Sequence, residues 1–178
     1  MIKSALFLGK PSISLTGFMF TGKSSAGRAL ARKLELKYID LDAEIQKAEG
    51  ASIESIFAER GEPEFRRLER EAVARIIPLS GQVVATGGGV VIDPENRKLM
   101  ARHSCIIWLR ASAGTILERW RRSRGKVRPL LSVADPRKEI IRLLEERNSY
   151  YRECDFSVDT DRLTVKEVCE SIIKKLSS

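Results

Sequence analysis

The stretch Gly17-Phe18-Met19-Phe20-Thr21-Gly22-Lys23-Ser24 sets the starting point for the fold. It matches the pattern GxxxxGK[ST], with a strand-like segment before it (12–16) and a helix-like segment after it (24–36). The glycines of such a loop let backbone N–H groups point at phosphate oxygens, and the helix N-terminus adds positive potential. The pattern predicts a strand–loop–helix unit that binds nucleotide phosphates, with Lys23 on the β- and γ-phosphates and Ser24 on Mg²⁺.

Beyond this unit, apolar strand-like segments alternate with segments whose apolar residues have helical spacing. The predicted strands are 38–41, 82–86, 105–109 and 156–158, and the predicted helices are 42–60 (one or two, with a break at Gly50 and Ser52 as a new N-cap), 61–77, 94–101, 112–120, 136–151 and 164–176. This alternation is typical of a parallel sheet covered on both faces. We therefore predict an α/β protein with three α/β/α layers and a five-stranded parallel sheet.

Length and composition limit the possible classes of protein. The 178 residues fit one domain (1–178), and 43% hydrophobic with 31% charged residues is typical of a folded, soluble chain. No apolar run approaches the roughly 20 residues of a membrane helix, and no signal peptide is evident, so we expect a cytoplasmic protein without a membrane partner. Cys105, Cys154 and Cys169 form no CxxC pair, and the single His103 argues against histidine-based metal sites and triads.

The formal charge of +8 is concentrated in one short stretch. Its basic residues are Arg119, Arg121, Arg122, Arg124, Lys126 and Arg128. Such a stretch could bind an RNA backbone, or it could be a lid that closes over a polyphosphate. No aromatic residue is interleaved in its core, which weakens the interpretation as a site for single-stranded nucleic acid.

Two further motifs carry acidic and basic groups. Asp40-Leu41-Asp42 ends the second predicted strand, where residues i and i+2 share a face, so both carboxylates can point into the crevice at the sheet edge. One would lie near Mg²⁺ and the other near an acceptor hydroxyl, although Asp42 alone is also compatible with a helix N-cap. Arg66 and Glu69, three residues apart on a helix, can pair and present a guanidinium to a carboxylate, although a solvated charged face has the same pattern.

Three motifs complete the set. Thr86-Gly87-Gly88-Gly89 follows a strand and permits close approach of the backbone to a ligand. Val127-Arg128-Pro129-Leu130-Leu131 ends the basic stretch, at the position of a lid between two helices. Arg147 lies with Tyr150 and Tyr151 on the helix after it, and taken alone it is typical of a surface residue.

In order, the motifs GFMxTGKS, DLD, FRRLE, TGGG, VRPLL and ERNxxY resemble the shikimate kinase family, in the nucleoside-monophosphate-kinase branch of P-loop proteins. The resemblance spans residues 12–176. It implies strand order 2-3-1-4-5, substrate-binding helices at about 42–77 and a mobile lid at about 119–131. It also implies transfer of a phosphoryl group from ATP with Mg²⁺ to shikimate, giving shikimate 3-phosphate for aromatic amino-acid biosynthesis, by a monomer.

The resemblance also assigns roles to individual residues. Those implied to hold the nucleotide are Gly17, Thr21, Gly22, Lys23, Ser24, Ser25, Arg121, Arg128 and Arg162, with Ser24 and Asp40 serving Mg²⁺. Those implied to hold shikimate are Asp42, Phe57, Phe65, Arg66, Glu69, Gly87, Gly88, Gly89 and Arg147. Lys23, Asp42 and Arg128 would be catalytic, with Asp42 as the base and Arg128 brought in by the lid. Phe20 departs from the family, which usually has glycine there.

Other functions fit parts of the pattern. A gluconate-type or nucleotide kinase would share the fold, but a nucleotide kinase needs a pocket for a second base where this chain offers a carboxylate clamp. A phosphate-loop regulator that binds RNA would use the basic stretch. A non-catalytic relative is disfavoured by the presence of Lys23, Asp42 and Arg128. We expect small molecules, and no nucleic acid, as partners.

Overall fold

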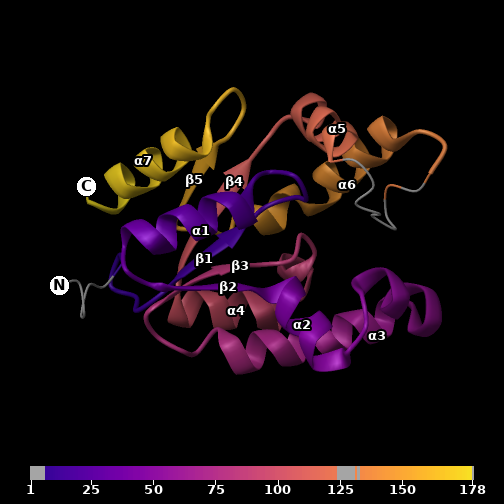
Figure 1. Ribbon diagram of the computed structural model, residues 1–178, viewed down its shortest axis with the longest axis horizontal. Coiled ribbons are helices and arrows are strands. Elements are labelled where there is room, and N and C mark those ends of the chain that lie inside the picture. The colour runs from indigo at the N-terminus through magenta and orange to yellow at the C-terminus, as the bar shows by residue number, and fades with distance from the viewer. Residues whose placement is uncertain (1–6, 124–130, 132, 178) are drawn as a thin grey trace.

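A parallel β-sheet separates two layers of helices (Figure 1). The computed structural model describes residues 7–123, 131 and 133–177. Within them the sheet has five strands in the order β2-β3-β1-β4-β5, as the resemblance implies. The strands are β1 (Ile13–Thr16), β2 (Lys37–Asp40), β3 (Gln82–Ala85), β4 (Cys105–Arg110) and β5 (Phe156–Asp159). Every pair is parallel, so the carboxyl ends of the strands lie along one edge of the sheet. The predicted fold class is confirmed.

Each face of the sheet has its own apolar core because successive strand residues point to opposite sides. In β4, Ile107 packs on one face with α1 (Lys23–Lys33) and α7 (Val165–Leu176). Its neighbour Ile106 packs on the other face with α3 (Ile53–Ile76) and α4 (Pro94–His103).

A third cluster lies at the carboxyl edge of the sheet. There Phe18, in the loop after β1, packs against Ile116 of α5 (Ala113–Arg122) and Ile140 of α6 (Pro136–Tyr151). The cluster fixes the loop after β1 against the two helices that flank the predicted lid. Residues 124–130, with Arg128 and most of that lid, lie outside the described residues.

The boundary after β2 differs from the prediction. The strand ends at Asp40 and α2 (Leu41–Glu49) begins at once, one residue before the predicted start at 42. Asp42 therefore lies in the first turn of a helix, and the strand spacing argued for Asp40 and Asp42 does not apply. Asp40 is the N-cap and accepts a hydrogen bond from the N–H of Ala43 (3.4 Å). The predicted break at Gly50 is present, with Gly50 in the left-handed conformation (φ 62°).

The next helices agree more closely. Ser52 caps α3 as predicted, and the non-helical backbone of Gly61 (φ 81°, ψ 169°) divides α3 at the boundary predicted between 42–60 and 61–77. A short 3-10 helix, η1 (Val90–Ile92), follows the triple glycine and was not predicted. Within the described residues, none of the helices has the length and apolar character needed to cross a bilayer.

Candidate active site

The loop between β1 and α1 wraps around the side chain of Lys23. The Lys23 Nζ donates hydrogen bonds to the carbonyls of Gly17 (2.7 Å) and Phe18 (2.8 Å), and the side chain is almost fully buried. A Cβ atom at Gly17 would collide with the carbonyl oxygen of Leu109, so only glycine allows β1 to turn this close to β4. Gly22 has a left-handed backbone conformation (φ 94°) and is the N-cap of α1, so the N-terminus of α1 faces the loop. The arrangement is that of an anion-binding loop.

Side chains with oxygen atoms that could bind a metal ion lie beside this loop. The Ser24 hydroxyl donates to Oδ2 of Asp40 (2.9 Å), and the Tyr38 hydroxyl donates to the same oxygen (3.1 Å). Burial and the neighbouring Asp40 charge raise the pKa of Tyr38 to about 12, so the phenol stays a hydrogen-bond donor at neutral pH. A serine hydroxyl and a carboxylate are hard ligands of the kind Mg²⁺ prefers.

A second group of charged side chains surrounds the triple glycine. Arg66 donates through Nη1 to Oε2 of Glu69 (2.8 Å), and the Glu69 side chain is only 2% exposed. Its other oxygen, Oε1, is buried and accepts no hydrogen bond from the described residues. Burial raises the pKa of Glu69 to about 7, against the opposing effect of Arg66.

The glycines are needed because these side chains pack directly against them. A Cβ atom at Gly87 would lie 2.8 Å from both Asp42 Oδ1 and Glu69 Oε1. A Cβ atom at Gly89 would collide with the guanidinium of Arg66. The missing side chains therefore make room for two carboxylates and one guanidinium around a short length of backbone.

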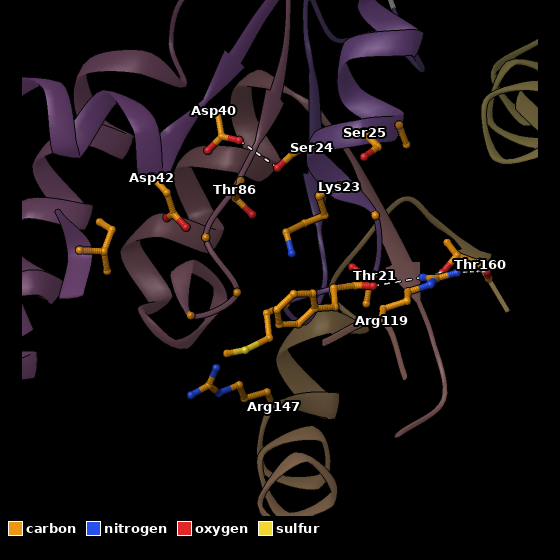
Figure 2. Close-up of a pocket in the computed structure, with 18 of the residues that line it drawn as sticks. Thr21, Lys23, Ser24, Ser25, Asp40, Asp42, Thr86, Arg119, Arg147 and Thr160 are labelled. Atoms are coloured by element: carbon orange, nitrogen blue, oxygen red, sulfur yellow. Dashed lines mark hydrogen bonds between the residues drawn. The ribbon is translucent and has the colours of Figure 1, made fainter. Parts of the chain in front are cut away.

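Arg147 extends from α6, across from Asp42 and Lys23 (Figure 2). It is buried, its guanidinium lies 5.9 Å from the centre of the Phe18 ring, and its Nε donates no hydrogen bond within the described residues. One turn later, the Tyr151 hydroxyl donates to the carbonyl of Gly88, and the Tyr151 ring stacks on Trp108. A buried guanidinium with an unused N–H is suited to binding an anionic group.

Both groups of residues line one cavity of about 520 Å³. Figure 2 shows Lys23, Asp42 and Arg147, from three different elements, directing their charged ends toward the same space. Phe57 and Phe65, with ring centres 4.7 Å apart, form an apolar part of the wall. The cavity thus combines an anion-binding loop, arginines, carboxylates and exposed backbone.

Comparison with known proteins decides the family. A family model described as shikimate kinase matches residues 19–177. A curated shikimate kinase from Thermodesulfovibrio yellowstonii is 44% identical over 92% of this chain and 94% of its own length. The chain belongs to the shikimate kinase family.

Other relatives agree with this assignment. A shikimate kinase from Thermus thermophilus is 46% identical over 92% of this chain and 89% of its own length. The solved shikimate kinase from Acinetobacter baumannii, in complex with shikimate, has a TM-score of 0.90 and 31% identity, and covers 96% of this chain and 95% of its own. The family membership implies use of ATP.

Most of the residues that the sequence singled out lie together at the shikimate kinase cavity. Its walls include Thr21, Gly22, Lys23, Ser24, Ser25, Asp40, Asp42, Phe57, Phe65, Arg66, Glu69, Gly87, Gly88, Gly89 and Arg147. Gly17 is not among the lining residues, but its carbonyl accepts a hydrogen bond from Lys23, which is. Arg121 and Arg162 are exposed and are not among the lining residues, and Arg128 is outside the described residues. The roles of all these residues stay predictions.

Sequence reasoning missed Arg119, which lines the cavity where Arg121 was predicted to act. The structure shows Arg119 half-buried and Arg121 and Arg122 exposed. Helical spacing does not separate Arg119 from Arg121, because they lie three and four residues after the buried Ile116 and Leu117. Tyr38 and Thr160 were missed as well, and nothing in their local spacing marks them out. Tyr151 was named in the motif with Arg147 but was given no role.

Magnesium fits the residues present. Among the described residues, no three His, Cys, Asp or Glu side chains come together as a protein-only metal site. Ser24 and Asp40 instead offer two oxygen ligands beside the anion-binding loop. This is the usual way for Mg²⁺ to be held, because it keeps several waters and shares substrate phosphates.

Proposed function

We propose that the chain transfers the γ-phosphoryl group of ATP to a hydroxyl of shikimate, giving ADP and shikimate 3-phosphate. The observation that carries the proposal is the single cavity in which the loop around Lys23 and the arginine–carboxylate group around Gly87 meet. Phosphoryl transfer needs the donor and the acceptor side by side, and this cavity has a suitable surface for each.

The acceptor pocket suits a small acid that carries hydroxyl groups. We assign the carboxylate of the acceptor to Arg66 and Arg147, because both side chains line the cavity and the buried Nε of Arg147 has no hydrogen-bond partner among the described residues. Glu69 holds Arg66 in place through a hydrogen bond. Asp42 and the backbone at Gly87 would bind the ring hydroxyls, and Phe57 and Phe65 would contact the apolar face of the ring.

The residues would act mainly by positioning and by neutralising charge. Asp42 would accept the proton of the attacking hydroxyl. Lys23 would exchange its carbonyl partners for phosphate oxygens when the nucleotide binds. Ser24 and Asp40 would hold Mg²⁺, which when bound neutralises the charge of the phosphates. Arg128 would reach the phosphates from the lid and help to exclude water.

We extend the proposal to the whole chain. Residues 1–178 would act as one domain and as a monomer, with ATP and shikimate as partners and no nucleic acid or membrane. A cytoplasmic location would suit a kinase that draws on cellular ATP.

The test is ADP release from Mg-ATP with shikimate, gluconate and nucleoside monophosphates supplied separately. We expect strong stimulation by shikimate alone. Asp42→Asn serves as the matched control, because it keeps the size of the side chain but removes the base. Stimulation by gluconate or a nucleotide instead would overturn the acceptor assignment while leaving phosphoryl transfer in place. No ADP release with any acceptor would overturn the proposal as a whole.

A further inference from the structure

A tyrosine that the sequence analysis did not single out lies beside the two residues assigned to Mg²⁺. Tyr38, in β2, donates its hydroxyl to Oδ2 of Asp40 (3.1 Å). The Ser24 hydroxyl donates to the same oxygen (2.9 Å), and Figure 2 shows this second hydrogen bond. Tyr38 and Asp40 are two residues apart in a strand, so their side chains share a face, and the phenol can reach the carboxylate.

The aromatic ring of Tyr38 is fixed by α1, the helix that carries Ser24. A Cβ atom at Gly27 would lie 2.8 Å from Cε2 of the ring, so the ring lies against the backbone of α1 about one turn after Ser24. The Arg28 guanidinium lies 5.2 Å from the ring centre, within range of a cation–π interaction. The position of the hydroxyl is therefore set by β2 and α1 together.

Hydrogen bonds hold both oxygens of the Asp40 carboxylate. Oδ2 accepts from Tyr38 and Ser24, and Oδ1 accepts from the N–H of Ala43 (3.4 Å). These three donors are neutral, so they orient the carboxylate without neutralising its negative charge. Hydrogen bonds of this kind fix the direction of the oxygens that meet a metal ion or its waters, which strengthens metal binding.

We propose that Tyr38 is a positioning residue for magnesium, which holds the Asp40 carboxylate in the orientation that it shares with Ser24. The inference rests on the proposed function in one respect, the assignment of Mg²⁺ to Ser24 and Asp40. It gives Tyr38 no contact with nucleotide, acceptor or ion, because Tyr38 is not among the residues that line the cavity. Its effect passes through Asp40.

The substitution Tyr38→Phe isolates the hydroxyl from the ring. Phenylalanine keeps the ring that packs against Gly27 and Arg28, and it removes only the hydrogen bond to Asp40. Tyr150→Phe is the matched control, because it removes the same group from a half-buried tyrosine whose ring contacts Arg97.

The direct readout is metal affinity. Mn²⁺ prefers the same oxygen ligands as Mg²⁺, and its electron paramagnetic resonance signal reports the free ion. It is titrated into each protein mixed with an equal amount of ADP and no acceptor. We expect Tyr38→Phe to weaken Mn²⁺ binding by about tenfold, the lower end of the usual cost of losing a partner of a metal ligand. Tyr150→Phe should bind Mn²⁺ like the unchanged protein.

Two further measurements separate positioning of Asp40 from a general disturbance of α1. ADP affinity without metal, measured by calorimetry in EDTA, and KM for shikimate should each change less than about twofold in Tyr38→Phe. In the double variant with Asp40→Asn, Tyr38→Phe should add little to the loss that Asp40→Asn causes alone, since the hydroxyl acts through that carboxylate.

Three results would overturn the proposal: unchanged Mn²⁺ affinity in Tyr38→Phe, an equal loss of metal-free ADP affinity, or the full additional loss in the double variant. Its failure is distinct from failure of the proposed function. If the chain phosphorylates another acceptor, Mn²⁺ binding with ADP still tests Tyr38, and the expected loss is the same. If Asp40→Asn leaves Mn²⁺ affinity unchanged, the magnesium assignment and the role of Tyr38 are both overturned, whereas ADP release with shikimate still decides the reaction.

Discussion

Asp42 illustrates how a residue can reach its predicted place for a different reason from the one expected. Sequence analysis ended the strand at residue 41 and began a helix at 42, but it used the strand spacing of Asp40 and Asp42 to place both side chains on one face. In the structure it lies in the first turn of α2, while Asp40 caps that helix. Both still line the cavity, because the helix begins at the carboxyl edge of the sheet. The proximity of Asp42 to Gly87 is thus a property of the turn into α2.

We predict that Asp42→Asn lowers kcat by about a hundredfold or more, the usual contribution of a general base. ADP affinity should change little, because Asp42 lies with the acceptor group rather than the phosphate loop. Steady-state kinetics with calorimetry of ADP binding measures both quantities. Equal loss of turnover and ADP affinity would mean that Asp42 has a structural role.

Glu69 should make stability depend on pH. Its pKa rises from the model-peptide value of 4.5 to about 7 because burial disfavours the charged form, despite Arg66 beside it, with Asp42 raising it further and Arg147 lowering it. Between these values the folded state holds more protons than the unfolded state. Glu69 therefore contributes stability at pH 4.5 that is lost as the pH rises through 7.

The measurement compares Glu69→Gln, which stays neutral, with the unchanged protein. The free energy of unfolding is measured in urea for both proteins between about pH 4.5 and 7.5. As the pH rises, the unchanged protein should lose on the order of 2 kcal/mol of stability relative to Glu69→Gln. Taking the difference removes the titration of groups common to both proteins. A difference independent of pH would mean that Glu69 is charged throughout this range.

At the scale of elements, the sequence could predict segments better than their ends. Apolar residues located all five strands, because each strand contains at least one buried apolar residue. The end of β2 was missed because Leu41 is apolar and fully buried, which fits a strand as well as a helix. Helical spacing could not separate Arg119 from Arg121 in α5, because each lies three or four residues after a buried residue. The contact of Tyr151 with Gly88 joins elements far apart in the chain, and local patterns carry no information about it.

We predict that Tyr151→Phe loosens the triple-glycine segment. It leaves the Gly88 carbonyl without its buried donor, which should cost about 1–3 kcal/mol of stability. KM for shikimate should rise several-fold, with KM for ATP nearly unchanged. The neighbouring Tyr150→Phe is the control, because Tyr150 is only partly buried and its ring contacts Arg97. A larger effect on ATP than on shikimate would contradict this role.

At the scale of the whole molecule, strand order came from the resemblance and not from the pattern of the residues. Periodicity shows which segments are buried, but any buried parallel strand could neighbour any other. The family motifs supplied the order because they imply a known fold. The position of the cavity follows from that order, since parallel strands bring the loop after β1 and the glycines after β3 to one edge.

The proposed single domain can be tested with the two tryptophans. Trp108 stacks on Tyr151 beside one core, while Trp120 packs against the cluster around Phe18. We predict that Trp108→Phe and Trp120→Phe variants, each with one remaining tryptophan, show fluorescence transitions that coincide with loss of helical signal in urea. An earlier transition for the remaining Trp120 would show that α5 and α6 unfold separately.

The undivided cavity also has a stereochemical consequence. Because the phosphate loop and the acceptor pocket open into one space, the incoming hydroxyl can attack phosphorus from the side opposite the departing ADP oxygen. A single direct displacement of this kind inverts the arrangement of the three remaining oxygens around phosphorus. Two successive displacements through a phosphorylated side chain would restore it. The shape of this cavity therefore predicts the handedness of a product labelled with three oxygen isotopes.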